Sequence, residues 1–324
     1  MGFIPKEEKL SYLGGKVLVY GVTGTGKSTV AGTWPKANLV DSESGQDFYL
    51  MDNENIIGVL PTTSAAEVQE TLNELEDEES LKGFDTVIID SYTKLYENMQ
   101  NAVYDIAYNR ARKQKMKGKD IDLDDVNISI RDWAIIKRLV QRLTNSYIKL
   151  SHMGKWIVAT AHEKDITKEA NGNHIVIGHK PDLPKKGEYD YDIIIRTFTE
   201  EDPKTGEVKY FGKIQKDRTG TTKLGEVIEN PSFEIWRDKW EKSKKYGAKV
   251  RDYSKDVDKD IHKIQEDEDN LEELIETFKE KIQTLEKADQ VKVQKKLKEL
   301  NIGNPLKTQD VDGMKAVVEF MEVL

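Results

Sequence analysis

A glycine-rich segment near the amino terminus ends in a lysine and two hydroxyl residues. It matches the pattern G-x-x-x-x-G-K-[ST] at every fixed position, with the residues Gly21, Val22, Thr23, Gly24, Thr25, Gly26, Lys27 and Ser28, then Thr29. Glycines let successive backbone N–H groups curl around phosphate oxygens, and a helix starting at the loop adds positive potential. We expect residues 21–29 to bind a nucleoside triphosphate, with Lys27 at its β- and γ-phosphates.

The second element of this chemistry is an acid at the end of an apolar run. Residues 85–90 read Asp-Thr-Val-Ile-Ile-Asp, which is typical of a buried strand. Next to such a phosphate loop, the loop hydroxyl and an acid of this kind hold Mg²⁺ against the nucleotide. We therefore expect Ser28 and Asp90 to bind Mg²⁺ and ATP to be the substrate. Taken alone, Asp90 is also compatible with an ordinary strand end.

Short apolar runs alternate with helical patterns between residues 16 and 240, which predicts the elements that hold these residues. The candidate strands are 16–20, 38–41, 56–60, 86–89, 156–160, 192–196 and 208–215. Several are almost wholly apolar, as in parallel strands that are covered on both faces. Apolar residues at helical spacing predict helices over 65–75 and 132–150. The alternation predicts an α/β fold with a mainly parallel central sheet.

Composition excludes several classes of protein. The chain has 324 residues, 50 Lys plus Arg, 59 Asp plus Glu and no cysteine. Without cysteine there is no disulfide framework, thiolate zinc site or cysteine nucleophile. The first nine residues lack the apolar segment of a signal peptide, and no apolar run is long enough to span a membrane. We expect a soluble cytoplasmic protein without membrane partners.

Four further motifs follow the phosphate loop. They are Asp-Ser-Glu-Ser-Gly at 41–45, Val-Ile-Ile-Asp-Ser at 87–91, Ala-Thr-Ala-His-Glu at 159–163 and Lys-Asp-Arg-Thr-Gly at 216–220. With them, residues 12–240 resemble the RecA-like ATPases, and most closely the phage nucleotide-binding proteins of the RecA-core single-strand annealing class. The resemblance implies a RecA-like P-loop NTPase core that hydrolyses ATP, binds single-stranded DNA and supports phage DNA recombination or annealing in the host cytoplasm.

The resemblance also implies roles for individual side chains. Glu43 matches the glutamate that polarises the attacking water, and His162 matches a polar sensor of the γ-phosphate. Lys216 and Arg218 match a Lys-x-Arg finger that reaches the γ-phosphate of a neighbouring subunit. The protein would then form a homo-oligomer, a ring or a filament, with an active site shared between protomers. A solvated turn for Glu43 and a basic hairpin turn for residues 216–218 are the plain alternatives.

Two basic segments are candidate DNA contacts. Residues 110–119 carry six positive charges and no acid, and residues 163–187 are expected to form a long loop. Flexible basic segments bind phosphate backbones without sequence preference, although most charge runs only face solvent. RecA-like proteins also place DNA-contacting loops after the strand expected at 156–160. The candidates are Arg110, Arg112, Lys113, Lys115, Lys117, Lys164, Lys168, Lys180, Lys185 and Lys186.

The sequence changes character near residue 251. Residues 251–324 carry 13 Lys plus Arg against 19 Asp plus Glu, and apolar residues at helical spacing return only after residue 270. We expect an ATPase core over 1–250, a charged linker over 251–270 and a small helical module over 271–324. The module would cap the core, hold neighbouring subunits together, or bind a partner such as a single-strand binding protein.

Two other functions fit parts of the pattern. A nucleotide-switched assembly or loader ATPase would act on a protein partner and would not need DNA. A small-molecule kinase would need arginines that clamp phosphates, for which Arg110 and Arg112 are the candidates. The kinase interpretation leaves Glu43 and the motif at 216–218 unexplained.

Overall fold

A computed structural model describes residues 5–6, 12, 14–45, 47–77, 79–170, 173–247 and 254–324, without the side chains of 170, 173, 254–258 and 264–269. The chain divides into two compact units, Met1–Arg251 and Asp252–Leu324. Each unit is described by itself. No helix in the described part of the chain is long and apolar enough to cross a membrane.

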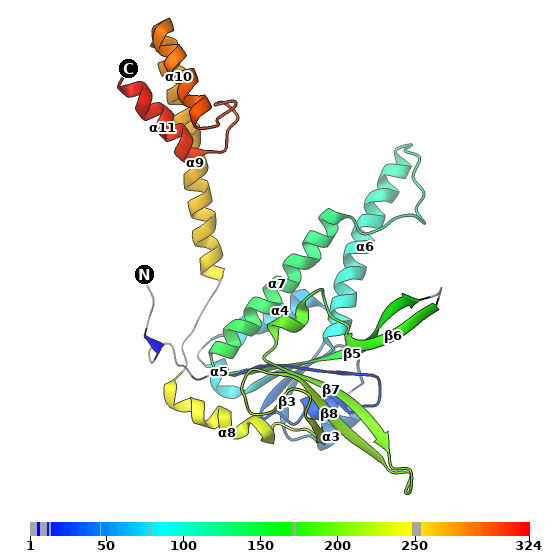
Figure 1. Ribbon diagram of the computed structural model, residues 1–324. Coiled ribbons are helices and arrows are strands. Elements are labelled where there is room, and N and C mark those ends of the chain that lie inside the picture. The colour runs from blue at the N-terminus through cyan, green and yellow to red at the C-terminus, as the bar shows by residue number, and fades with distance from the viewer. Residues whose placement is uncertain are drawn as a thin grey trace. The chain divides into compact units, whose positions relative to one another are not determined.

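Within the described residues, the first unit is built on a nine-stranded sheet (Figure 1). Its strands are β1 Lys16–Gly21, β2 Ala37–Asp41, β3 Ile56–Pro61, β4 Thr86–Asp90, β5 Trp156–Ala170, β6 Asn173–Pro181, β7 Ile193–Glu201, β8 Val208–Asp217 and β9 Val227–Glu229. The order is β3-β2-β4-β5-β1-β7-β8-β9, and β6 pairs with β5. Neighbours from β3 to β7 are parallel, whereas β8 and β9 are antiparallel to the strand before them in this order. Every strand predicted from the sequence is present.

Helices cover both faces of this sheet. They are α2 Lys27–Ala31, α3 Asp47–Asp52, α4 Ala65–Glu74, α5 Ser80–Gly83, α6 Tyr92–Met116, α7 Ile130–His152 and α8 Glu234–Ser243. Alternate residues of β1 face opposite layers: Leu18 packs in the core under α4, α6 and α7, and Val19 packs in the core with α2 and α8. This confirms the α/β fold with a mainly parallel central sheet expected from the sequence.

Two segments differ from the expected loops. Residues 163–170 and 173–181 form a β-hairpin, because β5 continues to Ala170 and pairs with β6 in antiparallel register. The β-branched residues Ile166, Ile175 and Ile177 favour strands, although the surrounding charges and glycines suggested a loop. The basic segment at 110–119 is helical up to Met116, at the end of α6. Figure 1 shows α6 and α7 extending beyond the sheet as a long antiparallel pair.

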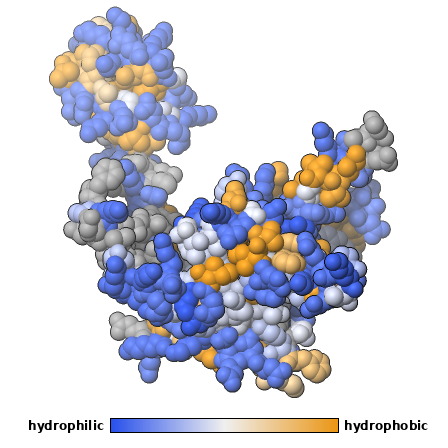
Figure 2. Space-filling model, turned by 60° about the horizontal axis from the view of Figure 1, so that its bottom comes forward, coloured by the Kyte–Doolittle hydropathy of each residue, from blue (hydrophilic) through white to orange (hydrophobic). Residues whose placement is uncertain are grey.

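Exposed apolar side chains occur on this unit, and several lie on the β5–β6 hairpin. Ile166, Ile175, Val176 and Ile177 are all more than a third exposed. Figure 2 shows hydrophobic side chains gathered in patches on a surface that is otherwise mainly hydrophilic. Single exposed apolar residues are common in soluble proteins, so the patches alone identify no partner.

The second unit consists of three helices in its described part: α9 Ser254–Thr284, α10 Lys287–Glu299 and α11 Val311–Glu322. Val293, Met314 and Val317 are fully buried in a core that this unit forms by itself. The expected linker at 251–270 is therefore wrong from Ser254 onward, because this charged stretch is the first half of α9. Its many acidic and basic residues suggested a tether, but the lysines and glutamates among them are also good helix formers. Residues 251–253 lie outside the described part.

Candidate active site

The chemistry-bearing residues of the first unit meet at one edge of the sheet. Gly21 at the end of β1 is in register with His162 of β5, and Asp41 at the end of β2 is in register with Asp90 at the end of β4. Because these strands are parallel, their carboxyl ends lie together. Residues that are far apart in sequence therefore surround the loop that follows Gly21.

The phosphate loop is shaped by its glycines and anchored to β7. Gly24 and Gly26 adopt positive φ angles of 76° and 83°, which glycine reaches without steric cost. The Thr25 hydroxyl lies 2.8 Å from the Thr197 hydroxyl on β7. A Cβ at Gly21 would stand 2.4 Å from that same Thr197 Oγ1, so a larger residue would push the loop off β7.

Ser28 and Asp90 lie side by side, as predicted for a Mg²⁺ site. Ser28 Oγ donates to Asp90 Oδ2 over 2.7 Å, and the Thr160 hydroxyl donates to Asp90 Oδ1. Burial raises the pKa of Asp90, while the hydrogen bonds from Thr160 and Ser28 oppose that shift. By donating its proton to Asp90, Ser28 keeps its oxygen lone pairs for a cation. Oxygen donors of this kind are what Mg²⁺ prefers, so the residues present fit the ion.

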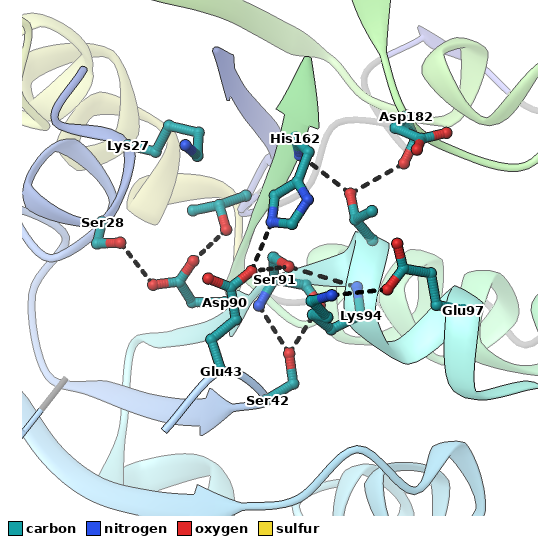
Figure 3. A network of polar contacts seen from close by, with 12 residues as sticks. Lys27, Ser28, Ser42, Glu43, Asp90, Ser91, Lys94, Glu97, His162 and Asp182 are labelled. Atoms are coloured by element: carbon teal, nitrogen blue, oxygen red, sulfur yellow. Dashed lines mark hydrogen bonds and ion pairs between the residues drawn. The ribbon is translucent and has the colours of Figure 1, made fainter. Parts of the chain in front are cut away.

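Glu43 stands at the centre of a second polar cluster (Figure 3). Its Oε1 accepts hydrogen bonds from the Ser91 hydroxyl at 2.5 Å and from His162 Nε2 at 2.7 Å. The turn before it is fixed by Asp41, whose Oδ1 accepts the N–H groups of Glu43 and Ser44 at 3.1 and 2.9 Å. Glu43 is thus a held side chain and not a free turn residue.

Electrostatics keep Glu43 ionised. Partial burial disfavours its charge, but hydrogen bonds from Ser91 and His162 and the positive charge of Lys27 hold the pKa of Glu43 below its ordinary value. Burial lowers the pKa of Lys27, and the nearby charges of Asp90 and Glu43 act in the opposite direction. Lys27 Nζ donates to the carbonyl oxygen of Val22 at 3.0 Å, within the phosphate loop itself. The site therefore pairs a cation at the loop with a carboxylate that is charged at neutral pH.

A pocket of about 470 Å³ continues from the phosphate loop toward β8 and β9, and lies in the size range of small-molecule sites. Beyond the loop it is lined by Tyr210, Phe211 and residues 230–232. Tyr210 lies close over Gly26, where an added Cβ would be 3.4 Å from the ring. Its aromatic ring offers a face for a nucleotide base. No spacing in the sequence revealed Tyr210, because only the pairing of β8 with β7 brings it to the loop.

Lys216 and Arg218 lie at the opposite end of the sheet. The backbone N–H of Arg218 donates to the carbonyl oxygen of Asp192. The backbone N–H of Asp192 donates in turn to the carbonyl oxygen of Lys16, the first residue of β1. The phosphate loop begins at the other end of β1, about 17 Å away at the usual rise per strand residue. Burial and the neighbouring Arg218 charge lower the pKa of Lys216. Arg218 thus cannot serve the phosphate loop of its own chain.

The predicted DNA contacts fall in three places. Lys164, Lys168 and Lys180 lie on the β5–β6 hairpin, and Lys185 and Lys186 lie in the turn that follows it. Arg112, Lys113, Lys115 and Lys117 are exposed at the far end of α6. Arg110 also contacts the buried carboxylate of Asp132 at 3.3 Å, which ties α6 to the first turn of α7, and its side chain is still 48% exposed.

Comparison with known families agrees with the phosphate loop. The AAA domain family matches residues 14–223 of this chain. No curated protein matches it. Among solved structures, the flagellar accessory protein FlaH from Methanocaldococcus jannaschii is 16% identical in sequence, with a TM-score of 0.33. The match covers 68% of this chain and 85% of the FlaH chain. That likeness is too distant to carry an argument, but the family match spans most of the first unit. The chain belongs to the AAA domain family.

Proposed function

We propose that this protein is a Mg²⁺-dependent ATPase of RecA-like type that hydrolyses ATP to ADP and phosphate and acts on single-stranded DNA in phage recombination or annealing. The observation that carries the proposal is the convergence of Lys27, Ser28, Asp90, Glu43 and His162 at the carboxyl ends of β1, β2, β4 and β5. A phosphate loop alone would serve many reactions. A held carboxylate opposite that loop favours attack by water.

Binding and orientation come from the phosphate loop. Its backbone N–H groups and Lys27 hold the β- and γ-phosphates, and Tyr210 receives the base in the adjoining pocket. Mg²⁺, when bound, neutralises charge on the phosphates and stabilises the transition state. Ser28 would supply an oxygen ligand to the ion, and Asp90 orients Ser28 through its 2.7 Å hydrogen bond. These residues fix the γ-phosphate for in-line attack.

Glu43 and His162 act on the attacking water and on the γ-phosphate. An ionised Glu43 accepts a hydrogen bond from water and orients its oxygen toward phosphorus. Because Glu43 accepts from Nε2 of His162, that nitrogen carries the ring's proton. The same N–H can donate either to Glu43 or to a phosphate oxygen, but it cannot do both at full strength. Arrival of the γ-phosphate would therefore draw His162 away and leave Glu43 free for water.

Self-association is part of the proposal. Arg218 and Lys216 lie at the amino end of β1, so they can complete only the site of another subunit. A guanidinium supplied in this way stabilises the transferring phosphoryl group and raises rates by about 10³–10⁵. The helical unit 252–324 is proposed to hold neighbouring subunits or to bind a single-strand binding protein.

Steady-state ATP hydrolysis with and without unstructured single-stranded DNA tests the DNA part of this proposal. We expect a several-fold stimulation that weakens as salt rises, because basic residues contact the phosphate backbone. Hydrolysis that is indifferent to DNA even at low salt would contradict it. The rival function, a nucleotide-switched loader that acts on a protein partner, would then be favoured by the separate helical unit with its own core.

A further inference from the structure

A second cavity, of about 660 Å³, lies between the α6–α7 pair and the turn that leads into β7. Its described lining residues include Tyr96 of α6, Trp133 and Lys137 of α7, and Lys185, Lys186 and Tyr189 of the turn. None of them lines the nucleotide pocket. We call this cavity the α7 groove, and the proposed reaction makes no use of it.

Two aromatic side chains are presented to solvent in the α7 groove. Trp133 is 43% exposed and Tyr189 is 66% exposed. The sequence has five tryptophans, all in the described part of the chain, and each of the other four is at most 5% exposed. A large apolar ring is costly to leave in water, so an exposed tryptophan in a groove indicates a surface that a partner covers.

The turn that carries Tyr189 is held by Lys216 of β8 and by Arg218, which follows β8 directly. Lys216 Nζ donates to the Tyr189 carbonyl oxygen at 3.2 Å, and an Arg218 N–H donates to the same oxygen at 3.5 Å. These contacts hold the backbone that carries the Tyr189 ring. A ring on a fixed backbone loses little conformational entropy when something stacks on it.

The charges that line the α7 groove are mainly positive. Lys137, Lys185 and Lys186 line it, and Asp190 is the single acid among its described lining residues. This positive balance occurs in a chain with a net charge of −9. Aromatic faces between lysines suit a ligand that alternates planar bases with phosphates, whereas an apolar peptide would leave three ammonium groups without a partner.

We propose that the α7 groove binds a single-stranded polynucleotide, with bases stacked on Trp133 and Tyr189 and phosphates paired with Lys137, Lys185 and Lys186. The inference rests on the proposed function, which makes single-stranded DNA the ligand. Gln141 is the one amide side chain in the described lining, and stacking on aromatic rings with lysine–phosphate contacts does not depend on base identity, so we expect binding to tolerate changes of sequence. The groove thus assigns DNA contacts to α7 and the turn after the hairpin, and Lys185 and Lys186 gain a defined role.

Trp133 provides the direct measurement, because it is the exposed tryptophan of the chain. Oligo-dT at low salt should quench the tryptophan emission of the wild type, and this quenching should be absent in Trp133→Phe. The anisotropy of labelled oligo-dT should show that Trp133→Phe still binds the oligonucleotide. Tyr189→Ala should weaken binding by about 5- to 150-fold, the usual effect of one lost stacking partner. Lys137→Ala should lower the slope of log K against log salt by about 0.7, the value for one phosphate contact on a single strand. Lys82→Ala, an exposed lysine on α5, is the charge-matched control and should bind as the wild type does.

The outcomes separate this inference from the function on which it rests. If labelled oligo-dT binds but leaves Trp133 unquenched, and Tyr189→Ala and Lys137→Ala bind normally, the groove is the wrong surface while DNA binding stands. If the wild type fails to bind oligo-dT at low salt, both proposals fall. If polyglutamate quenches Trp133 as strongly as oligo-dT does, the groove binds an acidic protein segment and the proposal that it binds a polynucleotide is wrong. Tighter binding of oligo-U than of oligo-dT would overturn DNA as the ligand.

Discussion

Replacing Glu43 by Gln separates the structural from the chemical role of this side chain. Glutamine has nearly the same shape, and its carbonyl oxygen can still accept from the Ser91 hydroxyl and from His162 Nε2. What is lost is the negative charge, and with it the ability to take a proton from water. Because Glu43 does not belong to the phosphate loop, nucleotide binding should be kept.

The expected magnitudes differ strongly between stability and rate. The side chains of Glu43 and His162 are 37% and 38% exposed, and even a charged pair with such exposure contributes only about 0.2–1 kcal/mol to folding. A positioned acid or base contributes about 10²–10⁴ in rate, which is about 3–5 kcal/mol of transition-state stabilisation. Glu43→Gln should therefore barely change the free energy of unfolding and should reduce kcat by at least about 100-fold.

Three assays on the same preparation decide the matter: chemical denaturation, titration with a fluorescent ATP analogue, and phosphate release. Glu97→Gln is the matched control, because Glu97 is a carboxylate of similar exposure that forms an ion pair with Lys94 on α6. It should hydrolyse ATP at the wild-type rate. A Glu43→Gln protein that retains kcat within a few-fold of the wild type would refute the role of Glu43 in activating water.

Four further predictions follow from the same geometry. Tyr210→Ala should raise the KM for ATP by about tenfold, since the base loses its stacking face; an unchanged KM would move the base elsewhere. Asp217 accepts hydrogen bonds from Thr219, Thr222 and Trp236, so Asp217→Asn should lower the free energy of unfolding at neutral pH by about 2 kcal/mol. Partial burial tends to raise the pKa of Asp217, but these hydrogen bonds hold it below its ordinary value. The ionised side chain therefore stabilises the fold above the unfolded-state pKa of about 3.9, and this stabilisation is lost as pH falls through the folded-state pKa. Denaturation curves of the wild type and the variant should accordingly converge in acid. Deletion of residues 252–324 should leave nucleotide binding intact, because each unit has its own core; loss of the circular dichroism of the first unit would contradict separate folding. Arg218→Ala subunits mixed into the wild type should lower hydrolysis more than in proportion to their fraction if the finger acts between subunits, and a linear decline would exclude it.

Local patterns in the sequence predict much of this fold and part of the site. The phosphate loop is one continuous segment, and Asp90 ends an apolar run, so both are visible without tertiary structure. The parallel strands are equally clear, because each is covered on both faces and is almost wholly apolar. The position of Glu43 and His162 at the same edge of the sheet then follows from the parallel arrangement.

Other features depend on contacts that a one-dimensional pattern does not contain. The contact of Arg110 with Asp132 joins residues 22 positions apart, which become neighbours only when α6 and α7 pack together. Tyr210 reaches the phosphate loop through the pairing of β7 with β8. The charged residues of the expected linker occur equally in tethers and in exposed helices, so composition could not reveal the first half of α9.

Release of phosphate from ATP tests the central claim most directly, with the wild type and Lys27→Ala compared at equal Mg²⁺ and with oligo-dT present. Lys27 lines the pocket and is the loop cation that we expect at the β- and γ-phosphates, and its side chain is not part of the hydrophobic core. The account predicts Mg²⁺-dependent hydrolysis by the wild type and none above background by Lys27→Ala. A wild type that releases no phosphate under these conditions, or a Lys27→Ala protein that hydrolyses ATP equally well, would contradict it.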